Sequence, residues 1–242
     1  MKFYTELKDK MAQLVEKHDL SQKEITIRTA ALTPEEAIGV TGRKDFPLLK
    51  GKEILMNAYF KDSVGQAFTD QPSIFTGSIE QLMELDLSSN NNRALFIASA
   101  NAILKHLGLI DKTVHCKNEE PEMCARQIRE WLKEKYGGRK IALVGFQPAI
   151  LDHVRQDFQL RILDLNNQNI GQVKYGVLIE DGEKSLSDVL SWADVVLATG
   201  STVTNGTILN FMDQGKEVFF YGTTIAGAAY LKGLNRLCFC AS

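Results

Sequence analysis

The residues with the clearest chemical potential form a short polar segment directly after a buried strand. Residues 194–199 read DVVLAT, and the next eight positions include two glycines, an amide and several hydroxyls, with Gly200, Ser201, Thr202, Asn205, Gly206 and Thr207 as the candidate site residues. A loop that leads from a strand into a helix presents N–H groups that can bind phosphate, carboxylate or sulfate. Alternatively, these residues only cap a helix that begins near Asn205, while Gly200 permits a tight turn. The segment is not a P-loop, because the Gly-Lys-Ser/Thr ending is absent.

A second candidate site pairs Gly145 with Asp164. Gly145 follows the apolar run IALV, and Asp164 ends the next predicted strand, a separation of 164 − 145 = 19 residues. In dinucleotide-binding folds, an acidic residue ~20 positions after the glycine loop binds a ribose hydroxyl. Only one of the three usual glycines is present, so a complete NAD or FAD site is disfavoured. A nucleoside-type ligand such as S-adenosylmethionine remains open, as does Asp164 capping a turn with Asn166 and Asn167.

The four cysteines suggest a third chemistry, because all of them lie beyond residue 115. His115, Cys116 and Cys124 flank an acidic stretch, and Cys238 and Cys240 can place both thiols on one side of an extended segment. Four thiolates and an imidazole are enough to bind a soft or borderline transition metal. Against this, there is no Cys-x-x-Cys pair, and free cysteines are often simply buried small hydrophobes. The cofactor is therefore unknown, with such a metal as one candidate.

No catalytic signature accompanies these sites. The sequence contains neither Gly-x-Ser-x-Gly nor His-Glu-x-x-His. Whether the protein is an enzyme is therefore left open.

The second half of the chain alternates short apolar runs with segments of helical length. The runs predict strands over 141–146, 160–165, 175–180, 194–199 and 217–222, with helices over 147–158, 185–193 and 202–215. This order predicts an α/β fold with a parallel, doubly wound sheet. Ligands of such sheets bind beyond the carboxyl ends of the strands, which is where both candidate loops lie.

The first half has a different pattern. An amphipathic helix is predicted over 3–18, followed by β-type runs over 25–32, 37–40, 53–60 and 64–69 that favour a small antiparallel sheet. A capping-box spacing at Ser78 predicts a short helix. Asn90, Asn91 and Asn92 are expected to break the chain, and a helix over 93–107 is expected to end at Gly108.

Composition limits the partners. The chain has 242 residues and a net charge of −2, with 28 basic residues scattered among 30 acidic ones, so nucleic acid is not an expected partner. The N-terminus is too charged for a signal peptide, and no run approaches the ~20 apolar residues of a membrane span. We expect a cytoplasmic protein with reduced cysteines, no membrane partner, and a small molecule or metal as ligand. A homo-oligomer is possible.

The chain resembles the putative heavy-metal chelation family, formerly a domain of unknown function numbered 364. The likeness covers nearly the whole chain and rests on DVVLATGSTVTNGTI, IALVGFQPAI, LDLNNQNIG, VGQAFTD and NRALFIASANAIL. It implies an N-terminal α+β domain like the enolase N-terminal fold, residues 1–91, and a Rossmann-like C-terminal domain, residues 92–242. The chain departs from many members after the last strand, where residues 221–227 replace a Gly-Pro-Ser-Thr-Pro stretch.

The resemblance also implies a site in the cleft between the domains. The loop at Gly200 to Thr207, the Gly145 loop and the turn at Gly65 and Gln66 would line this cleft. The leading hypothesis is a protein that binds a small anionic or metal-chelating ligand there, with Ser201, Thr202, Asn205 and Thr207 as polar contacts. The alternative is a transferase or lyase using an adenosine-containing cofactor, with Asp164 on the ribose.

Overall fold

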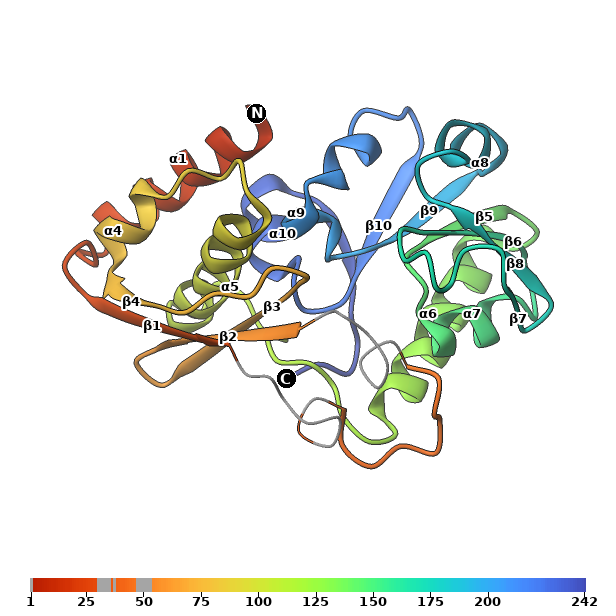
Figure 1. Ribbon diagram of the computed structural model, residues 1–242, viewed down its shortest axis with the longest axis horizontal. Helices are drawn as coiled ribbons and strands as arrows, with labels where there is room; N and C mark the ends of the chain where they lie inside the picture. Colours follow the sequence, from red (N-terminus) through yellow and green to blue (C-terminus); the bar gives the residue numbers. More distant parts are fainter. Residues whose placement is uncertain (1, 30–35, 37, 47–53) are drawn as a thin grey trace.

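Two sheets lie side by side in the molecule (Figure 1). The computed structural model describes residues 2–29, 36, 38–46 and 54–242. The first sheet is antiparallel, in the order β3-β2-β1-β4. Its strands are β1 (Glu24–Thr29), β2 (Ile54–Phe60), β3 (Ser63–Thr69) and β4 (Phe75–Ser78), accompanied by helices α1 (Lys2–Lys17), α4 (Ile79–Glu84) and α5 (Asn90–His106).

Local sequence signals explain most of this first unit. The predicted capping box at Ser78 is present: the Gln81 backbone N–H donates to Ser78 Oγ (3.2 Å), and the Ser78 N–H donates to Gln81 Oε1 (3.0 Å). Gly108 follows α5 with a φ of +69°, a backbone conformation that favours glycine. Three of the four β-type runs form β1, β2 and β3. The fourth, 37–40, falls partly outside the described residues, and Gly39 and Val40 are in no strand.

The predicted chain break at Asn90 to Asn92 is wrong, because these residues form the first turn of α5. Asparagine suits a helix N-terminus, where its short side chain can serve backbone groups that lack helical partners. Here the Asn90 side chain accepts a hydrogen bond from Arg93.

The second sheet has the order β11-β10-β9-β5-β6-β8-β7 and is parallel except for the β7–β8 pair. The five predicted strands are confirmed as β5 (Lys140–Val144), β6 (Gln159–Asp164), β8 (Val177–Asp181), β9 (Val195–Thr199) and β10 (Glu217–Tyr221). The short edge strands β7 (Val173–Lys174) and β11 (Asn235–Leu237) were not predicted.

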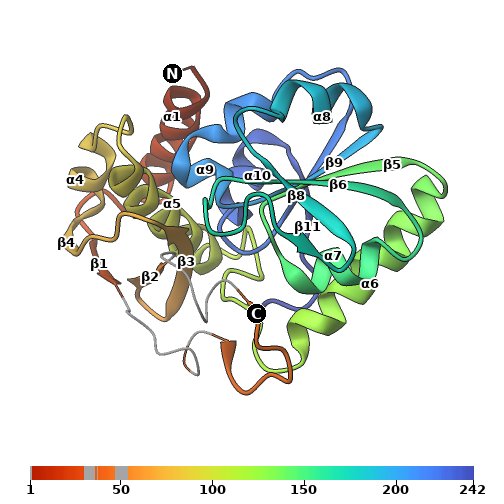
Figure 2. The same cartoon turned by 45° about the vertical axis from the view of Figure 1, so that its right-hand side comes forward.

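Helices cover both faces of this sheet (Figure 2). Ile141 and Leu143 of β5 pack in one hydrophobic cluster with α6 (Glu120–Tyr136) and α7 (Pro148–Val154), whereas Ala142 belongs to the cluster on the opposite face. This alternation follows from the two-residue period of a strand. The opposite face is covered by α8 (Leu186–Trp192), α9 (Thr202–Asn205) and α10 (Ala226–Lys232). None of the described helices is long and apolar enough to cross a membrane.

The single helix predicted over 202–215 is interrupted. Helix α9 ends at Asn205, Gly206 adopts a φ of +87°, and a 3₁₀ helix, η1, runs over Thr207–Phe211. Asn205 therefore lies at the end of a helix and does not begin one. A Cβ at position 206 would lie 3.2 Å from the Arg93 guanidinium, so both backbone conformation and packing favour glycine here.

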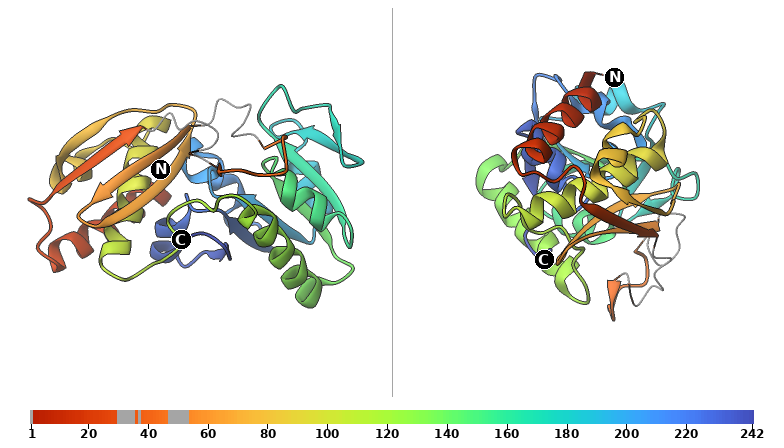
Figure 3. Two further views of the ribbon diagram at one scale, coloured as in Figure 1. Left: turned by 90° about the horizontal axis from the view of Figure 1, so that it is seen from below. Right: turned by 90° about the vertical axis from the view of Figure 1, so that its left-hand side faces the viewer.

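The two sheets, seen from two further sides in Figure 3, share one hydrophobic cluster. It includes Leu7 of α1 and Phe96 of α5, and continues to Val196 and Phe220 of the parallel sheet. Helix α5, which we expected to begin the second unit, packs against β2 and β3 of the first. A domain boundary at residue 91 stays a prediction.

Candidate functional site

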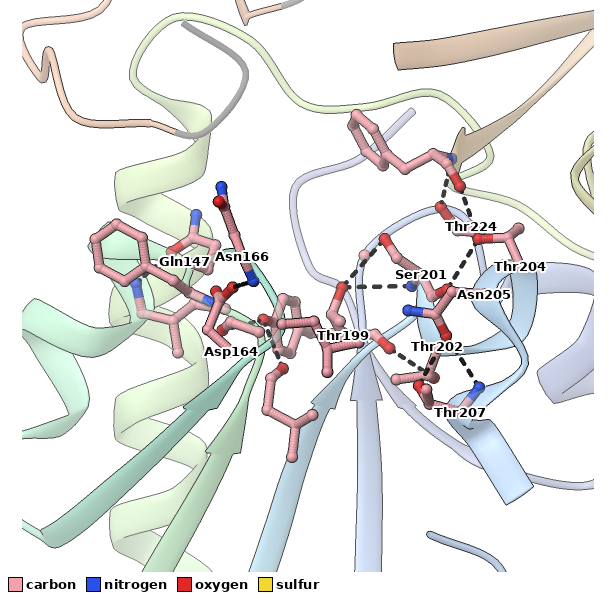
Figure 4. Close-up of a pocket in the computed structure, with 18 of the residues that line it drawn as sticks. Gln147, Asp164, Asn166, Thr199, Ser201, Thr202, Thr204, Asn205, Thr207 and Thr224 are labelled. Carbon is pink, nitrogen blue, oxygen red and sulfur yellow. Dashed lines mark hydrogen bonds between the residues drawn. The ribbon is translucent and has the colours of Figure 1, made fainter. Parts of the chain in front are cut away.

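The main cavity of the described molecule lies at the carboxyl ends of the parallel strands, facing the first sheet (Figure 4). Its volume is about 870 Å³. The parallel sheet contributes the loops after β5, β6, β9 and β10, and the first unit contributes Phe68, Thr69 and Asp70. Both candidate loops from the sequence therefore meet at one cavity, which we call the inter-sheet pocket.

The pocket lies where the order of the parallel strands reverses. From β5 the chain proceeds to β6 and β8 on one side, and then returns to β9 and β10 on the other. Gly145, after β5, and Thr199, at the end of β9, both line the pocket between these two directions. In open parallel sheets, this reversal leaves a crevice that ligands occupy.

Most backbone N–H groups of the polar loop form hydrogen bonds within the protein. The Gly200 N–H donates to the Tyr221 carbonyl (2.8 Å), and the Thr204 and Asn205 N–H groups both donate to the Ser201 carbonyl (3.0 and 3.2 Å). The Thr207 N–H donates to Asn205 Oδ1 (3.0 Å). With α9 only four residues long, the loop lacks the row of open N–H donors that binds anions at a helix N-terminus.

The side chains of this loop divide between structure and pocket. Ser201, Thr202, Asn205 and Thr207 line the pocket, as Figure 4 shows, whereas Gly200 and Gly206 are not in its lining. Two of the hydroxyls are already bonded, since Thr202 Oγ1 donates to the Thr199 carbonyl (2.8 Å) and Thr207 Oγ1 to Asn205 Oδ1 (2.7 Å). A ligand can still reach these groups through their remaining lone pairs.

The glycine at position 200 is explained by packing. A Cβ at this position would lie 2.9 Å from the backbone nitrogen of Ile225. Gly200 thus allows the end of β9 to approach the turn that leads into α10. It positions the site without lining it.

Gly145 and Asp164 both line the pocket, and the backbone directly after Gly145 is hydrogen-bonded to the Asp164 side chain. Asp164 Oδ2 accepts from the Phe146 N–H (2.7 Å), and Oδ1 accepts from the Asn166 N–H (2.6 Å). Gly145 has a φ of +87°, and its carbonyl accepts from the Tyr221 hydroxyl (2.9 Å). Asp164 therefore caps its own turn, as the simpler sequence interpretation held, and also faces the pocket.

Gly65 and Gln66, which the resemblance implied as lining, are not in the pocket lining. A Cβ at Gly65 would lie 2.2 Å from the Ala102 backbone nitrogen, so this glycine lets β3 pack closely on α5. Gln66 is 5% exposed, donates to Asn57 Oδ1 (2.9 Å) and accepts from the His115 N–H (2.6 Å). Both residues hold the first unit together beneath the pocket.

Sequence reasoning missed the residues that join the two units at the pocket. Asn101 of α5 is fully buried, and its Nδ2 reaches the carbonyls of Gln66 (2.9 Å) and Thr224 (3.1 Å), while its Oδ1 accepts from the Gly227 N–H (2.6 Å). Thr204 Oγ1 donates to the Phe68 carbonyl (2.8 Å). A buried asparagine within an apolar helix was the signal that could have revealed this link.

Thr223 is a second missed residue. It lines the pocket after β10 and is 1% exposed, and its hydroxyl has no hydrogen-bond partner. A buried hydroxyl without a partner is costly, which makes it a marker for an absent ligand or water. The Thr-Thr pair directly after a predicted strand was the available signal.

The pocket lining is acidic. Asp70, Asp164 and Glu183 line it, whereas the described part of the lining contains no Lys or Arg. A bare anion would therefore meet carboxylates, and of the basic residue types the described lining offers only His115.

Three of the predicted metal-ligand cysteines, Cys116, Cys124 and Cys238, line the pocket together with His115, whereas Cys240 does not. The Cys238 thiol and the backbone of Phe239 and Cys240 all act to lower the pKa of Cys124. The hydrogen bond from Cys238 is the main reason that the pKa of Cys124 is lowered, against the effect of burial. That same bond, with burial, raises the pKa of Cys238, and burial raises the pKa of Cys116 to about 12.

These thiols do not form a metal cage. Within residues 2–29, 36, 38–46 and 54–242, no group of three or more His, Cys, Asp or Glu side chains could hold a metal ion. A soft-metal site made of His115, Cys116, Cys124, Cys238 and Cys240 thus gains no support from this arrangement and stays a prediction.

Comparisons with known proteins agree with the fold. Residues 130–233 match the family model of DUF364, described as putative heavy-metal chelation. A DUF364 protein of unknown function from Pyrococcus horikoshii is similar in structure, with a TM-score of 0.57 and 16% identity over 92% of this chain and 79% of the other. A second, from Desulfitobacterium hafniense DCB-2, has a TM-score of 0.50 and 14% identity over 74% of this chain and 73% of the other.

At these identities the structural likeness shows the fold and nothing more. No curated protein matches the chain. The enolase-like description of the first unit stays a prediction. The resemblance seen in the sequence is confirmed: the chain matches the putative heavy-metal chelation family, DUF364, by sequence over residues 130–233 and by fold over most of its length.

Proposed function

We propose that the protein binds a small ligand in the inter-sheet pocket, and that this ligand is a metal–chelator complex and not a bare anion. The observation that carries the proposal is the pocket itself. It is a cavity of about 870 Å³ at the reversal of the strand order, rich in amide and hydroxyl groups, with carboxylates but no Lys or Arg in its described lining.

The leading sequence hypothesis allows either a small anion or a metal–chelator complex as the ligand. The charge of the pocket lining favours the complex. A free carboxylate or phosphate would need basic side chains or open N–H groups to replace its water. Most N–H groups of the loop bond within the protein, and the described lining offers carboxylates instead. A chelator that carries a divalent metal is less negative than the free chelator, so it suits this lining better.

The polar contacts are those expected from the sequence, with one addition. Ser201, Thr202, Asn205 and Thr207 present hydroxyl and amide groups to the pocket, and Thr223 adds its unpartnered hydroxyl. A ligand atom that bonds to Thr223 would relieve an unsatisfied group costing about 1–3 kcal/mol. Binding through this residue is therefore favoured beyond the contact alone.

A second candidate is a transferase or lyase that uses an adenosine-containing cofactor such as S-adenosylmethionine. The observation that favours it is the strand order β8-β6-β5-β9-β10-β11. With β5 counted first this is 3-2-1-4-5-6, the Rossmann-like order of dinucleotide-binding sheets. Asp164 then ends the second strand, where the ribose-binding acid of such folds lies, and a cationic sulfonium would suit the acidic lining.

Ligand-induced thermal stabilisation, followed by calorimetric titration, tests both candidates. The probes are citrate, citrate with equimolar Zn²⁺, Zn²⁺ alone, inorganic phosphate and S-adenosylmethionine. We expect the Zn²⁺–citrate complex to raise Tm more than any of its components. A Tm rise with S-adenosylmethionine that Asp164→Asn abolishes would support the second candidate instead.

Thr223→Val serves as the site variant and Thr113→Val as its matched control. Thr113 is also buried, but its hydroxyl donates to the Val64 carbonyl (2.6 Å), and it is not in the pocket lining. The Tm rise should shrink in Thr223→Val and persist in Thr113→Val. Phosphate or free citrate as the tightest binder, or equal loss in both variants, would contradict the proposal.

A further inference from the structure

Three amide side chains of the inter-sheet pocket are held in one orientation by the backbone. In each, the side-chain oxygen accepts a hydrogen bond from a backbone N–H two or three residues further along the chain. The amides, with the distance from the backbone nitrogen to the side-chain oxygen, are Gln147 (2.5 Å), Asn166 (3.0 Å) and Asn205 (3.0 Å). Because a backbone N–H can only donate, it fixes the oxygen on its own side and turns the amide nitrogen away.

The amide nitrogens are left for the pocket. All three residues line it and are half-buried. Figure 4 shows Gln147 and Asn166 on one side of the open strand ends and Asn205 on the other. Within the part of the chain that the structure describes, none of the three nitrogens donates to another protein group. The pocket therefore offers three oriented NH₂ donors that carry no charge.

The donors come from three neighbouring strands. Gln147 follows β5, Asn166 follows β6, and Asn205 ends the short helix after β9. Strand β5 pairs with β6 on one side and with β9 on the other. Neighbouring strands lie about 4.8 Å apart, so the three donors are spread over roughly two such spacings. A ligand with several acceptor atoms can bond to all of them at once.

We propose that the pocket selects a chelator that binds its metal through oxygen atoms, such as a polycarboxylate or a hydroxamate, and that Gln147, Asn166 and Asn205 recognise these oxygens. The inference rests on the proposed function, because it names the class of chelator in the metal complex.

The chemistry of the metal-binding atoms distinguishes the classes of chelator. An oxygen that binds a metal keeps a further lone pair, and a carboxylate also has a second oxygen, so both can accept from an amide NH₂. An amine nitrogen gives its only lone pair to the metal and keeps only N–H groups, which are donors. Donor would then face donor, and the amide groups of the pocket would lose their water without a new partner.

Charge and an independent buried group agree with an oxygen chelator. A metal neutralises much of the charge of the oxygens that bind it, so uncharged amide donors suit them and no Lys or Arg is needed in the described lining. Thr223, whose hydroxyl has no hydrogen-bond partner and which is 1% exposed, lines the same pocket and supplies one more donor.

Calorimetric titration of the full chain tests the selection. The probes are Zn²⁺–citrate and Zn²⁺–triethylenetetramine, with Zn²⁺ and each chelator alone as baselines. We expect Zn²⁺–citrate to bind about tenfold more tightly, the difference that two hydrogen bonds supply, although the acidic lining favours the positive charge of the amine complex. An amine complex that binds as tightly or more tightly would overturn the inference and leave the proposed function standing. Binding of neither complex would overturn both.

Two site variants test the amide donors. Asn205→Asp keeps the oxygen that the Thr207 N–H needs and replaces the NH₂ by a second oxygen. Gln147→Met removes the donor without adding charge, and its Tm without ligand checks that it is folded. Each should weaken Zn²⁺–citrate binding about fivefold, as expected for one hydrogen bond.

Asn118→Asp is the matched control. Asn118 Oδ1 also accepts from a backbone N–H, that of Val40 (2.9 Å), but the residue is not in the pocket lining. This variant should bind Zn²⁺–citrate like the wild type. Unchanged affinity in both site variants, or an equal loss in Asn118→Asp, would contradict the assignment. A loss in Asn205→Asp but not in Gln147→Met would reflect charge repulsion and overturn it as well.

Discussion

At the scale of single residues, the pocket contains both hydroxyls that stabilise the fold through hydrogen bonds and one hydroxyl that does not. Thr204 donates to the carbonyls of Phe68 and Ser201 (both 2.8 Å) and so links the two sheets. Thr223 is equally buried but has no partner. The same residue type therefore has opposite energetic roles at two positions in one site.

This contrast predicts opposite effects of the same substitution. Thr204→Val should lower the free energy of unfolding by about 1–3 kcal/mol, because it removes the hydrogen bond to the Phe68 carbonyl that links the two sheets. Thr223→Val should leave the ligand-free protein as stable as the wild type or slightly more stable, since it removes an unsatisfied group. Urea denaturation measures both, and equal losses in the two variants would count against this reading.

Glu122 predicts a pH effect. Burial alone would raise the pKa of Glu122, but hydrogen bonds with Arg43 Nε (2.5 Å) and His153 Nε2 (2.8 Å) outweigh it and lower the pKa. A carboxyl with a lowered pKa in the folded state stabilises the fold above its unfolded pKa of about 4.3, and the effect is lost as pH falls through the folded pKa. Stability should therefore decline on acidification below about pH 5, and less steeply in Glu122→Gln. Urea midpoints between pH 7 and 3 test this, with parallel curves as the contrary outcome.

At the scale of elements, the packing of α5 on β3 depends on Gly65. A methyl group there would lie within 2.2–2.3 Å of the α5 backbone at Ala102 and Ala98, so helix and strand would have to separate. Glycine in the middle of a strand often marks such a close approach.

Gly65→Ala should therefore destabilise the protein by on the order of 3 kcal/mol, an overpacking effect at the upper end of its usual range. Gly108→Ala is the matched control, because Gly108 has a φ of +69° but open space around it. Its cost should be only about 1 kcal/mol, from backbone strain alone. Thermal unfolding of the two variants compares them, and a smaller loss for Gly65→Ala would show that α5 can move freely.

Sequence patterns predicted elements better than they predicted the role of each residue. The apolar runs at 141–146 and 194–199 gave the central parallel strands, because burial on both faces leaves a continuous apolar signal. The helix predicted over 202–215 is interrupted at Gly206, which has a φ of +87° and leaves no room for a Cβ beside Arg93, a distant residue in sequence. Gly65 and Gln66 looked like cleft residues, but which way a strand faces depends on partners that the local sequence does not show.

At the scale of the whole molecule, Asn101 joins the two units. It bonds to Gln66 of the antiparallel sheet and to Thr224 and Gly227 after the last long parallel strand. Because β3 and the β10–α10 turn both border the pocket, this one side chain helps to fix the width of the pocket.

Removing that side chain should weaken the whole molecule. Asn101→Ala leaves several buried backbone groups unpaired and should cost about 3 kcal/mol or more. Ser99→Ala is the matched control on the same helix, since Ser99 is equally buried but bonds only to Leu95 within α5 (2.7 Å). Its loss should be below about 1 kcal/mol. Guanidinium denaturation of both variants would reveal whether the bridge matters more than burial of a polar group as such.

The hydrophobic cluster that joins the two sheets predicts that two optical signals change together when the protein unfolds. Both tryptophans of the chain, Trp131 in α6 and Trp192 in α8, pack beside the parallel sheet, so intrinsic fluorescence observes only that half. Far-UV circular dichroism observes both halves. Because the core is continuous, the two signals should change at one denaturant concentration. Separate midpoints would instead mean that the antiparallel half can unfold while the tryptophans stay packed beside the parallel sheet, opening one wall of the pocket.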